Sequence, residues 1–206
     1  FMAATGQDFT TGLKVMLRAS VSMHPVYGLS LVISAVNPEY TMGDLLRRRN
    51  EMLMRLKAEG ILEMNRSLPW PVPALRIAVI SAENAAGFGD FMNQLQSNSL
   101  RLRFTVKLFP AVMQGDRVPS TVISALETIA AQQDDWDCVV IIRGGGATSD
   151  LMGFENYDLA AHVAQFPLPV VVGIGHERDV TVLDYVAAVR AVSYTHLRAH
   201  ETGAYL

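Results

Sequence analysis

An arginine and three consecutive glycines follow an apolar run in the second half of the chain. Residues 138–150 read CVVIIRGGGATSD, so Arg143 precedes Gly144, Gly145 and Gly146. Glycines let a ligand approach the backbone closely, and successive N–H groups can form an anion-binding nest. The neighbouring arginine can add a bidentate fork for a phosphate. The stretch matches neither the GxxxxGK[ST] nor the GxGxxG pattern, and it predicts a phosphate site of another kind, with a strand-to-loop turn as the structural alternative.

Ionisable residues follow a second apolar run, VVVGIG, at residues 170–175. His176 can act as a general acid or base near neutral pH, and Glu177 and Asp179 supply carboxylates beside it. Asp90, which follows an earlier apolar run, is a further carboxylate of this kind. Each aspartate can instead cap a helix, and a lone histidine is more often structural than catalytic. The four side chains could bind a divalent metal in principle, but no ligand spacing demands one.

Alternating strand and helix patterns must position these residues. From residue 76 onward, short apolar runs alternate with segments of helical periodicity, which is typical of βαβ units and a parallel sheet. Ligands of such sheets bind at the carboxyl ends of the strands, so the ionisable residues are expected to converge at one edge. Gln114, Asp116 and Arg117 also follow a strand, and a turn alone explains them. The predicted strands are residues 76–81, 103–110, 137–142 and 169–174, and the predicted helices are residues 88–97, 119–132, 157–165 and 180–190.

The first part of the chain predicts a small β structure and a helix. Residues 12–36 show partial alternation of apolar and polar residues, which predicts two strands that form an incomplete sheet by themselves. Residues 41–59 have helical periodicity, with capping-box spacing between Thr41 and Asp44. The proline-rich stretch SLPWPVP at residues 67–73 cannot continue a helix and predicts a domain boundary.

Composition limits the classes of protein to which the chain can belong. It has 206 residues, 50% of them hydrophobic, and a formal net charge of −3, so a nucleic-acid-binding role requires a local basic surface. Arg47, Arg48 and Arg103 are candidates for it, although a solvated helix face explains the first two equally well. The single cysteine, Cys138, supports no disulfide framework and fits a reducing compartment. No apolar run approaches the roughly 20 residues of a membrane span and no signal peptide is evident, so a cytoplasmic protein is expected.

The motifs of residues 76–191 resemble those of the large subunit of exodeoxyribonuclease VII, a family that degrades single-stranded DNA. RGGG followed by GHERD at this distance is fairly specific to that family, and AENAAGFGDF resembles its Bacteroidetes branch more than its enterobacterial branch. Residues 1–40 resemble the second half of the family's OB-fold domain, which grips single-stranded DNA. The matching stretches of the nuclease part are RIAVISAENAAGFGDF, LFPAVMQGDRVPSTVISAL, DCVVIIRGGGATSDLMGFENYDLA and FPLPVVVGIGHERDVTVLDYVA.

The resemblance implies a doubly wound, mostly parallel α/β sheet preceded by a partial OB-fold and a linker helix. After DYVAAVRA the family continues into a long helical region that binds several small subunits, and this region is expected to be missing here. The tail VSYTHLRAHETG instead resembles a translated sequencing adapter, so the native sequence is expected to stop near Ala191. The expected parts are residues 1–40 (partial OB-fold), 41–74 (linker helix and proline-rich connection), 75–191 (α/β nuclease domain, incomplete at its C-terminus) and 192–206 (non-native tail).

The resemblance also implies an activity and a set of site residues. The family hydrolyses phosphodiester bonds of single-stranded DNA from both ends, releases 5′-phosphorylated products and requires no added divalent metal. Its catalytic residues fall on Asp90, Arg143, His176 and Asp179, and its phosphate would lie on the three glycines. Two alternatives stay open: a non-catalytic α/β module that binds a phosphate or nucleotide at RGGG, and a metal-dependent phosphohydrolase.

Overall fold

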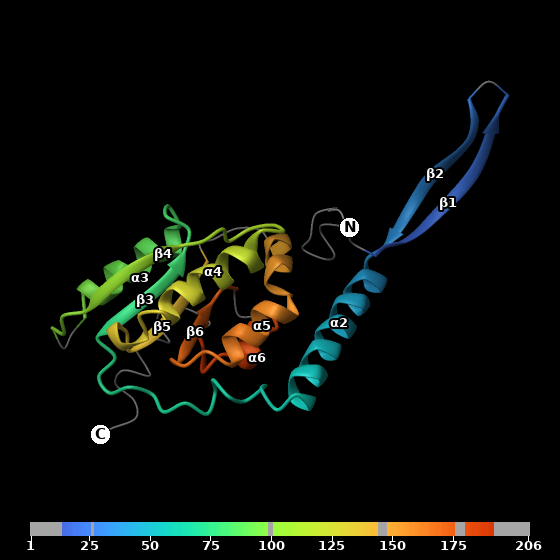
Figure 1. The fold of residues 1–206 in the computed structure, drawn as a ribbon. Coiled ribbons are helices and arrows are strands. Elements are labelled where there is room, and N and C mark those ends of the chain that lie inside the picture. The colour runs from blue at the N-terminus through green and yellow to red at the C-terminus, as the bar shows by residue number, and fades with distance from the viewer. Residues whose placement is uncertain (1–13, 26, 99–100, 144–147, 176–179, 192–206) are drawn as a thin grey trace. The chain divides into compact units, whose positions relative to one another are not determined.

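The structure, a computed structural model, describes residues 14–25, 27–98, 101–143, 148–175 and 180–191 (Figure 1). The chain divides into two compact units, Phe1–Glu51 and Met52–Leu206. None of the helices in these described ranges is both long and apolar enough to cross a membrane.

The first unit contains an antiparallel hairpin of two strands, β1 (Met16–His24) and β2 (Gly28–Asn37), as the alternation in residues 12–36 predicts. Gly28 has a φ of +76°, a value that favours glycine, at the point where the hairpin turns into β2. A two-stranded hairpin buries little apolar surface by itself. Large apolar side chains are accordingly exposed on both strands, among them Val21, Met23, Leu29, Leu31 and Ile33.

The helix α2 (Pro38–Ala58) begins earlier than the capping-box pattern predicts. Asn37 Oδ1 accepts two backbone N–H groups of the first turn, at 2.9 and 3.3 Å, and therefore caps the helix. Thr41 Oγ1 instead donates to the carbonyl oxygen of Lys14 at 3.0 Å, and Asp44 pairs with arginines of its own helix. The predicted capping box between Thr41 and Asp44 is therefore wrong, because an asparagine one turn earlier satisfies the helix N-terminus.

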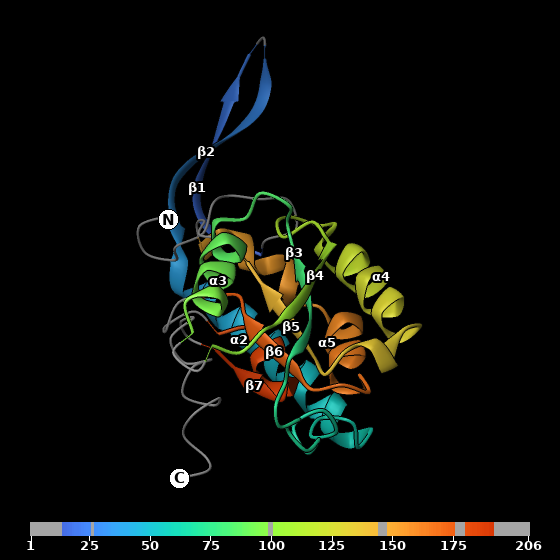
Figure 2. The same cartoon turned by 90° about the vertical axis from the view of Figure 1, so that its left-hand side faces the viewer.

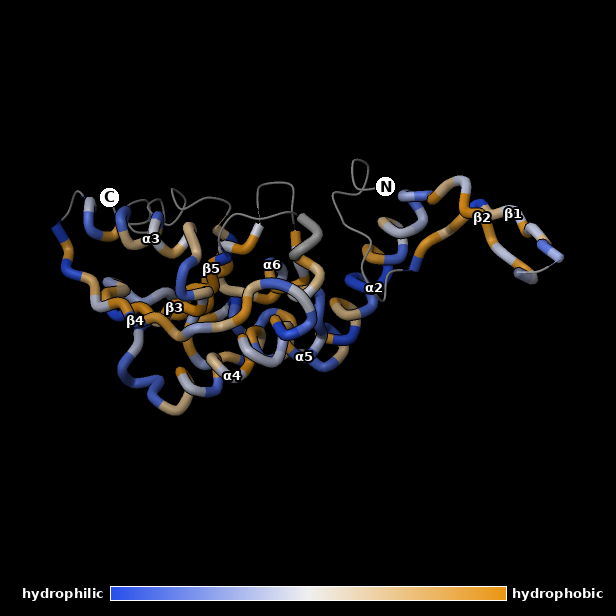
Figure 3. Tube along the Cα trace, turned by 90° about the horizontal axis from the view of Figure 1, so that it is seen from above, coloured by the Kyte–Doolittle hydropathy of each residue, from blue (hydrophilic) through white to orange (hydrophobic). Residues whose placement is uncertain are grey.

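The second unit is built on a five-stranded sheet in which every neighbouring pair of strands is parallel, in the order β4-β3-β5-β6-β7 (Figure 2). All of β5 and the first three residues of β6 are buried, as continuous apolar runs predict for strands covered on both faces. Figure 3 shows that apolar residues are also concentrated along β3, beside β5. The strands are β3 (Arg76–Ser81), β4 (Thr105–Pro110), β5 (Cys138–Ile142), β6 (Val170–Gly173) and β7 (Val189–Arg190).

Helices cover both faces of this sheet. Ile77 and Val79 of β3 share a core with the helix α3, whereas Ala78 and Ile80 share a core with α4, α5 and α6. Successive residues of one strand thus serve opposite faces, as the strand period of two requires. Figure 2 shows α3 on one side of the sheet and α4 and α5 on the other. The helices are α3 (Ala86–Gln96), α4 (Val118–Ala130), α5 (Tyr157–Ala164) and α6 (Leu183–Val186), with 3-10 turns η1 (Gln133–Asp135) and η2 (Thr148–Phe154).

The predicted helix over residues 180–190 is wrong for most of its length. Only Leu183–Val186 is helical, and Val189–Arg190 forms β7, which pairs in parallel with β6. A long-range hydrogen bond explains the break: Asn65 Oδ1 accepts the backbone N–H of Ala188 at 3.0 Å. This contact holds the chain extended at the point where helical periodicity alone would continue the helix.

Candidate functional site

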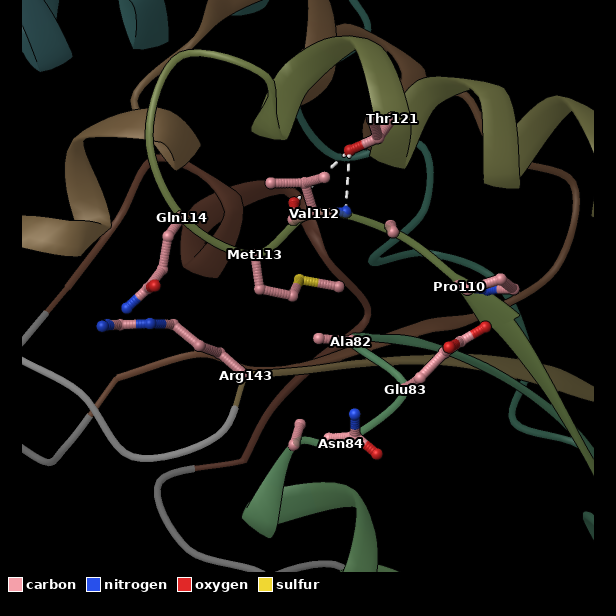
Figure 4. Close-up of a pocket in the computed structure, with 11 residues that line it drawn as sticks. Ala82, Glu83, Asn84, Pro110, Val112, Met113, Gln114, Thr121 and Arg143 are labelled. Carbon is pink, nitrogen blue, oxygen red and sulfur yellow. Dashed lines mark hydrogen bonds between the residues drawn. The ribbon is translucent and has the colours of Figure 1, made fainter.

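A cavity of about 620 Å³ lies at the carboxyl ends of β3, β4 and β5 (Figure 4). Its lining comes from residues 82–85 after β3, residues 110–114 at the end of β4, Thr121 of α4, and Arg143 directly after β5. This is the edge at which a parallel α/β sheet is expected to bind its ligand. The cavity therefore forms where the sequence predicts a site.

Arg143 is the one charged residue of the RGGG motif, and its side chain lines this cavity. It is 6% exposed. Its backbone N–H donates to the carbonyl oxygen of Gly173 at 3.2 Å, which continues the β5–β6 pairing beyond Ile142. The sheet fixes the backbone of Arg143, and its side chain extends from this fixed point into the cavity. Charge–charge attraction is stronger here than in open water, because burial lowers the local dielectric.

The strands β5 and β6, which precede the RGGG and GHERD motifs, end side by side. Ile142 of β5 is paired with Gly173 of β6, and the motif stretches begin immediately afterwards. The predicted site residues Gly144, Gly145 and Gly146, together with His176 and Asp179, lie outside the described residues. Their convergence with Arg143 stays a prediction, supported by the adjacency of the two strand ends.

The segment that leads from β4 into α4 is held by hydrogen bonds to both elements. The N–H of Ala111 donates to the carbonyl oxygen of Ser81 at 2.9 Å, so that the β3–β4 ladder extends by one bond. Thr121 Oγ1 accepts the N–H of Val112 at 3.1 Å (Figure 4). Met113 is buried, and Gln114 follows it at the cavity rim. These hydrogen bonds fix the backbone of the segment that carries Gln114.

Two polar residues after β3 complete the polar part of the lining. Glu83 and Asn84 are exposed at the cavity mouth. Figure 4 shows the Glu83 carboxylate on the side of the cavity opposite the Arg143 guanidinium and directed away from it. Asp90 is also exposed, lies on the second turn of α3 rather than at its start, and does not line the cavity. The helix begins at Ala86 after Ala85, which is its N-cap, so Asp90 does not cap it.

The basic residues predicted to follow a DNA backbone have different surroundings. Arg47 forms ion pairs with Asp44 and Glu51, and Arg48 forms one with Asp44 at 2.8 Å. The hydrogen bond from Arg47 holds the pKa of Asp44 below its usual value, and the same bond from Asp44 raises the pKa of Arg47. Arg103 is exposed just before β4. Part of the positive charge of α2 is therefore already balanced by its own carboxylates.

The arrangement can bind an anion. A buried guanidinium suits one phosphate, and the cavity walls around it are mostly apolar, including Ala82, Ala111 and Met113. Among the described residues, no group of three or more histidine, cysteine, aspartate and glutamate side chains could hold a metal ion. The buried guanidinium and the apolar walls around it suit phosphate recognition by Arg143.

Comparisons with known proteins show the family of the chain. The sequence model of the family described as "Exonuclease VII, large subunit" matches residues 61–196, which include every strand of the parallel sheet. The chain belongs to the exonuclease VII large subunit family. Three relatives that carry the name "Exodeoxyribonuclease 7 large subunit" are also similar to it.

The relative from Deinococcus radiodurans is 37% identical over 190 residues, which are 91% of this chain and 46% of the relative. Those from Cronobacter sakazakii and Serratia proteamaculans are 31% and 32% identical over 181 residues, which are 87% of this chain and 39% of each relative. The chain thus spans less than half the length of these exonuclease VII large subunits.

Gln114 of this exonuclease VII family member lines the cavity with Arg143, although a turn is the only role that the sequence predicts for it. Its position is a signal for the site, since it follows β4 as Arg143 follows β5. The signal is weak because a single glutamine carries neither a charge nor a titratable group.

Proposed function

We propose that the chain supplies the nuclease core of an exonuclease that hydrolyses phosphodiester bonds of single-stranded DNA. The products would be 5′-phosphorylated nucleotides and oligonucleotides, released from either end of the strand. One observation carries the proposal: in a chain of the exonuclease VII large subunit family, the buried Arg143 side chain lines a cavity at the carboxyl edge of the sheet.

In the proposed reaction, a water attacks the phosphorus and the bond to the 3′ oxygen breaks, so that the phosphate stays on the 5′ side. Arg143 and the N–H groups of the following glycines hold the phosphate and stabilise the charge that builds on its oxygens. His176 takes the proton from water and returns one to the leaving 3′ oxygen. Asp179 or Asp90 orients His176 or the water. The adjacency of the β5 and β6 ends supports the placement of Arg143 and His176 in one site.

The remaining parts of the proposal concern fold and partners. Helices on both faces of a parallel sheet support a doubly wound nuclease domain at residues 75–191. The antiparallel hairpin with exposed apolar side chains supports an OB-fold portion within residues 1–40, in which Tyr27, 84% exposed, would stack on bases. Residues 41–74 would link the two. Arg47, Arg48 and Arg103 would follow the DNA backbone, and the family's small subunits would bind to a region beyond the nuclease domain.

The test uses a chimera in which this chain replaces the aligned residues of the Deinococcus radiodurans relative, incubated with end-labelled single-stranded DNA with and without EDTA. Acid-soluble 5′-phosphorylated product in EDTA, lost on Arg143→Ala, is the expected result. Product abolished by EDTA would favour a metal-dependent phosphohydrolase. Binding of DNA by this chain and by a folded chimera without any cleavage would favour a non-catalytic module.

A further inference from the structure

The cavity at the carboxyl edge of the sheet is larger than a phosphate group requires. Its volume of about 620 Å³ lies within the range of roughly 300–1,000 Å³ that is typical of sites for small organic ligands. Arg143 lines only one part of it, and the rest of the lining comes from residues 82–85, residues 110–114 and Thr121. A ligand that fills the cavity must therefore carry a further group next to the phosphate, and the chemistry of the remaining walls indicates which group.

The walls next to Arg143 are mainly apolar. Ala111 and Met113, which are 9% and 5% exposed, line the cavity together with Ala82. In Figure 4 the Met113 thioether and the Ala82 methyl group lie between the Arg143 guanidinium and the mouth of the cavity. A thioether is polarisable and makes favourable contacts with aromatic rings, and every nucleobase has a π-face that could accept such a contact.

The backbone that carries Met113 is fixed immediately before this residue. The N–H of Ala111 donates to the carbonyl oxygen of Ser81 at 2.9 Å, and the N–H of Val112 donates to Thr121 Oγ1 at 3.1 Å. These bonds connect the segment to β3 on one side and to α4 on the other. The apolar wall therefore stands on a backbone that is already ordered without a ligand.

Two polar side chains at the cavity mouth suit the edge of a base. Glu83 and Asn84 are exposed there, and Figure 4 shows the Glu83 carboxylate on the side of the cavity opposite the Arg143 guanidinium. A carboxylate would repel a second phosphate, whereas the Asn84 carboxamide can donate to and accept from the edge of a base. From Arg143 to the mouth, the lining thus changes from cationic to apolar to polar. A nucleotide presents matching groups, namely a phosphate, the faces of sugar and base, and the edge of the base.

We propose that the cavity binds the nucleoside that is joined to the phosphate at Arg143, an inference that rests on the proposed function. One face of the base lies against the Met113 thioether, and the edge of the base lies toward Asn84. In a duplex the faces of a base are covered by stacking and its edge is paired, so only a base that has left the stack can occupy the cavity. The cavity thus selects single-stranded DNA, which a contact with the phosphate alone cannot do, because both kinds of DNA carry the same phosphates.

The experiment follows ligand binding to the full chain through the NMR signals of its ¹³C-labelled methionine methyl groups. The Met113 signal is assigned by its loss in Met113→Leu. Met54, which is 66% exposed on α2 and does not line the cavity, is the internal control. Two monomers are compared: thymidine 5′-monophosphate and 2-deoxyribose 5-phosphate, which lacks the base. Two polymers are compared as well: a short 5′-phosphorylated thymidine oligonucleotide and a GC-clamped duplex that contains the same thymidine run.

We expect thymidine 5′-monophosphate to shift the Met113 signal and to leave the Met54 signal unchanged. It should bind roughly tenfold more tightly than 2-deoxyribose 5-phosphate, as the burial of about 60 Å² of apolar surface predicts. The oligonucleotide should shift the Met113 signal, and the duplex should not. Met113→Leu should keep the difference in affinity between the two monomers, because leucine is apolar and of similar volume, whereas Met113→Ala should reduce it.

Equal affinities of the wild-type chain for the two monomers would overturn the inference, whether or not Met113→Ala folds. So would a Met113 signal that thymidine 5′-monophosphate does not move, or one that the duplex moves as far as the oligonucleotide does. Failure of the proposed function looks different: Arg143→Ala would leave the affinity for 2-deoxyribose 5-phosphate unchanged, while thymidine 5′-monophosphate still shifted the Met113 signal.

Discussion

The two edges of the parallel sheet use their polar groups in opposite ways. At the amino edge, the carboxylate of Asp137 accepts four hydrogen bonds, from the backbone N–H groups of Leu75 and Arg76 at 2.8 Å each and from the Arg76 guanidinium at 2.6 and 3.0 Å. At the carboxyl edge, Arg143 lines an open cavity and faces the amide of Gln114. An arginine paired with a carboxylate at the amino edge stabilises the fold, whereas the arginine at the carboxyl edge lines the cavity.

Asn65 strengthens the same contrast. Its side chain is fully buried and makes four hydrogen bonds, donating to the carbonyl oxygens of Phe166 and Leu168 and accepting from the N–H groups of Val170 and Ala188. These bonds fix the chain where β6 and β7 begin. The amino edge is therefore closed by satisfied polar groups, and the carboxyl edge holds the cavity.

The comparison predicts that two arginine substitutions have opposite consequences. Arg143→Ala should slow hydrolysis by the chimera about 10²- to 10³-fold, as the loss of one group that stabilises transition-state charge does. Arg76→Ala should lower the free energy of unfolding modestly, since its side chain is half exposed, and leave the rate per folded molecule unchanged. Single-turnover hydrolysis and urea unfolding measure the two effects. Similar losses of rate in both variants would break the comparison.

Removal of the buried amide at the amino edge should give the next largest effect. Asn65→Ala leaves two carbonyl oxygens and two N–H groups without their partner in a buried place, so the free energy of unfolding should fall by about 3 kcal/mol. Urea unfolding followed by circular dichroism measures this change. The control is Asn93→Ala on the exposed side of α3, which should change stability by less than about 0.5 kcal/mol. An equal change in the two variants would mean that the Asn65 hydrogen bonds do not hold β6 and β7.

Asp137 should make stability depend on pH. Burial alone would raise its pKa, but hydrogen bonds from Arg76 and from two backbone N–H groups outweigh burial and leave the pKa below its ordinary value of 3.8. A carboxyl group with a lowered pKa in the folded state contributes stability that is fully present above its unfolded pKa and is lost as the pH falls below it. Asp137→Asn should therefore lower the free energy of unfolding by about 2 kcal/mol at pH 7, and by less as the pH falls below about 4. A difference that does not shrink at low pH would show that the charge of Asp137 contributes nothing.

The sequence predicted the parts of the fold that follow from local pattern. The four predicted strands of the parallel sheet are confirmed within a few residues, because apolar runs buried on both faces leave little alternative. The edge strand β7 and the short α6 could not be predicted, since they depend on the Asn65 side chain, more than 100 residues away in the chain. Arg143 was selected because charge and glycines stand out in a sequence. The position of Gln114 in the cavity lining does not follow from the sequence, because a single glutamine after a strand is equally typical of a turn.

The smallest predicted effect concerns a basic residue at the edge opposite the cavity. Arg103 lies just before β4, and the six residues of that strand place it about 20 Å from the strand's carboxyl end. It can therefore contact the DNA backbone only at a distance from the phosphate that Arg143 is proposed to hold. Arg103→Ala should reduce the slope of log affinity against log salt by about 1 and weaken binding a few-fold, with no change in kcat.

Fluorescence anisotropy across a salt series measures the slope for this chain, and single-turnover hydrolysis by the chimera measures the rate. Arg103→Lys keeps the charge and should restore the wild-type slope, because a non-specific phosphate contact requires a cation rather than a guanidinium. A fall in kcat for Arg103→Ala as large as that for Arg143→Ala would mean that the reacting phosphate does not lie at the carboxyl edge. An unchanged slope would mean instead that the DNA does not pass the amino edge. Contact with DNA would then be confined to the carboxyl edge of the sheet.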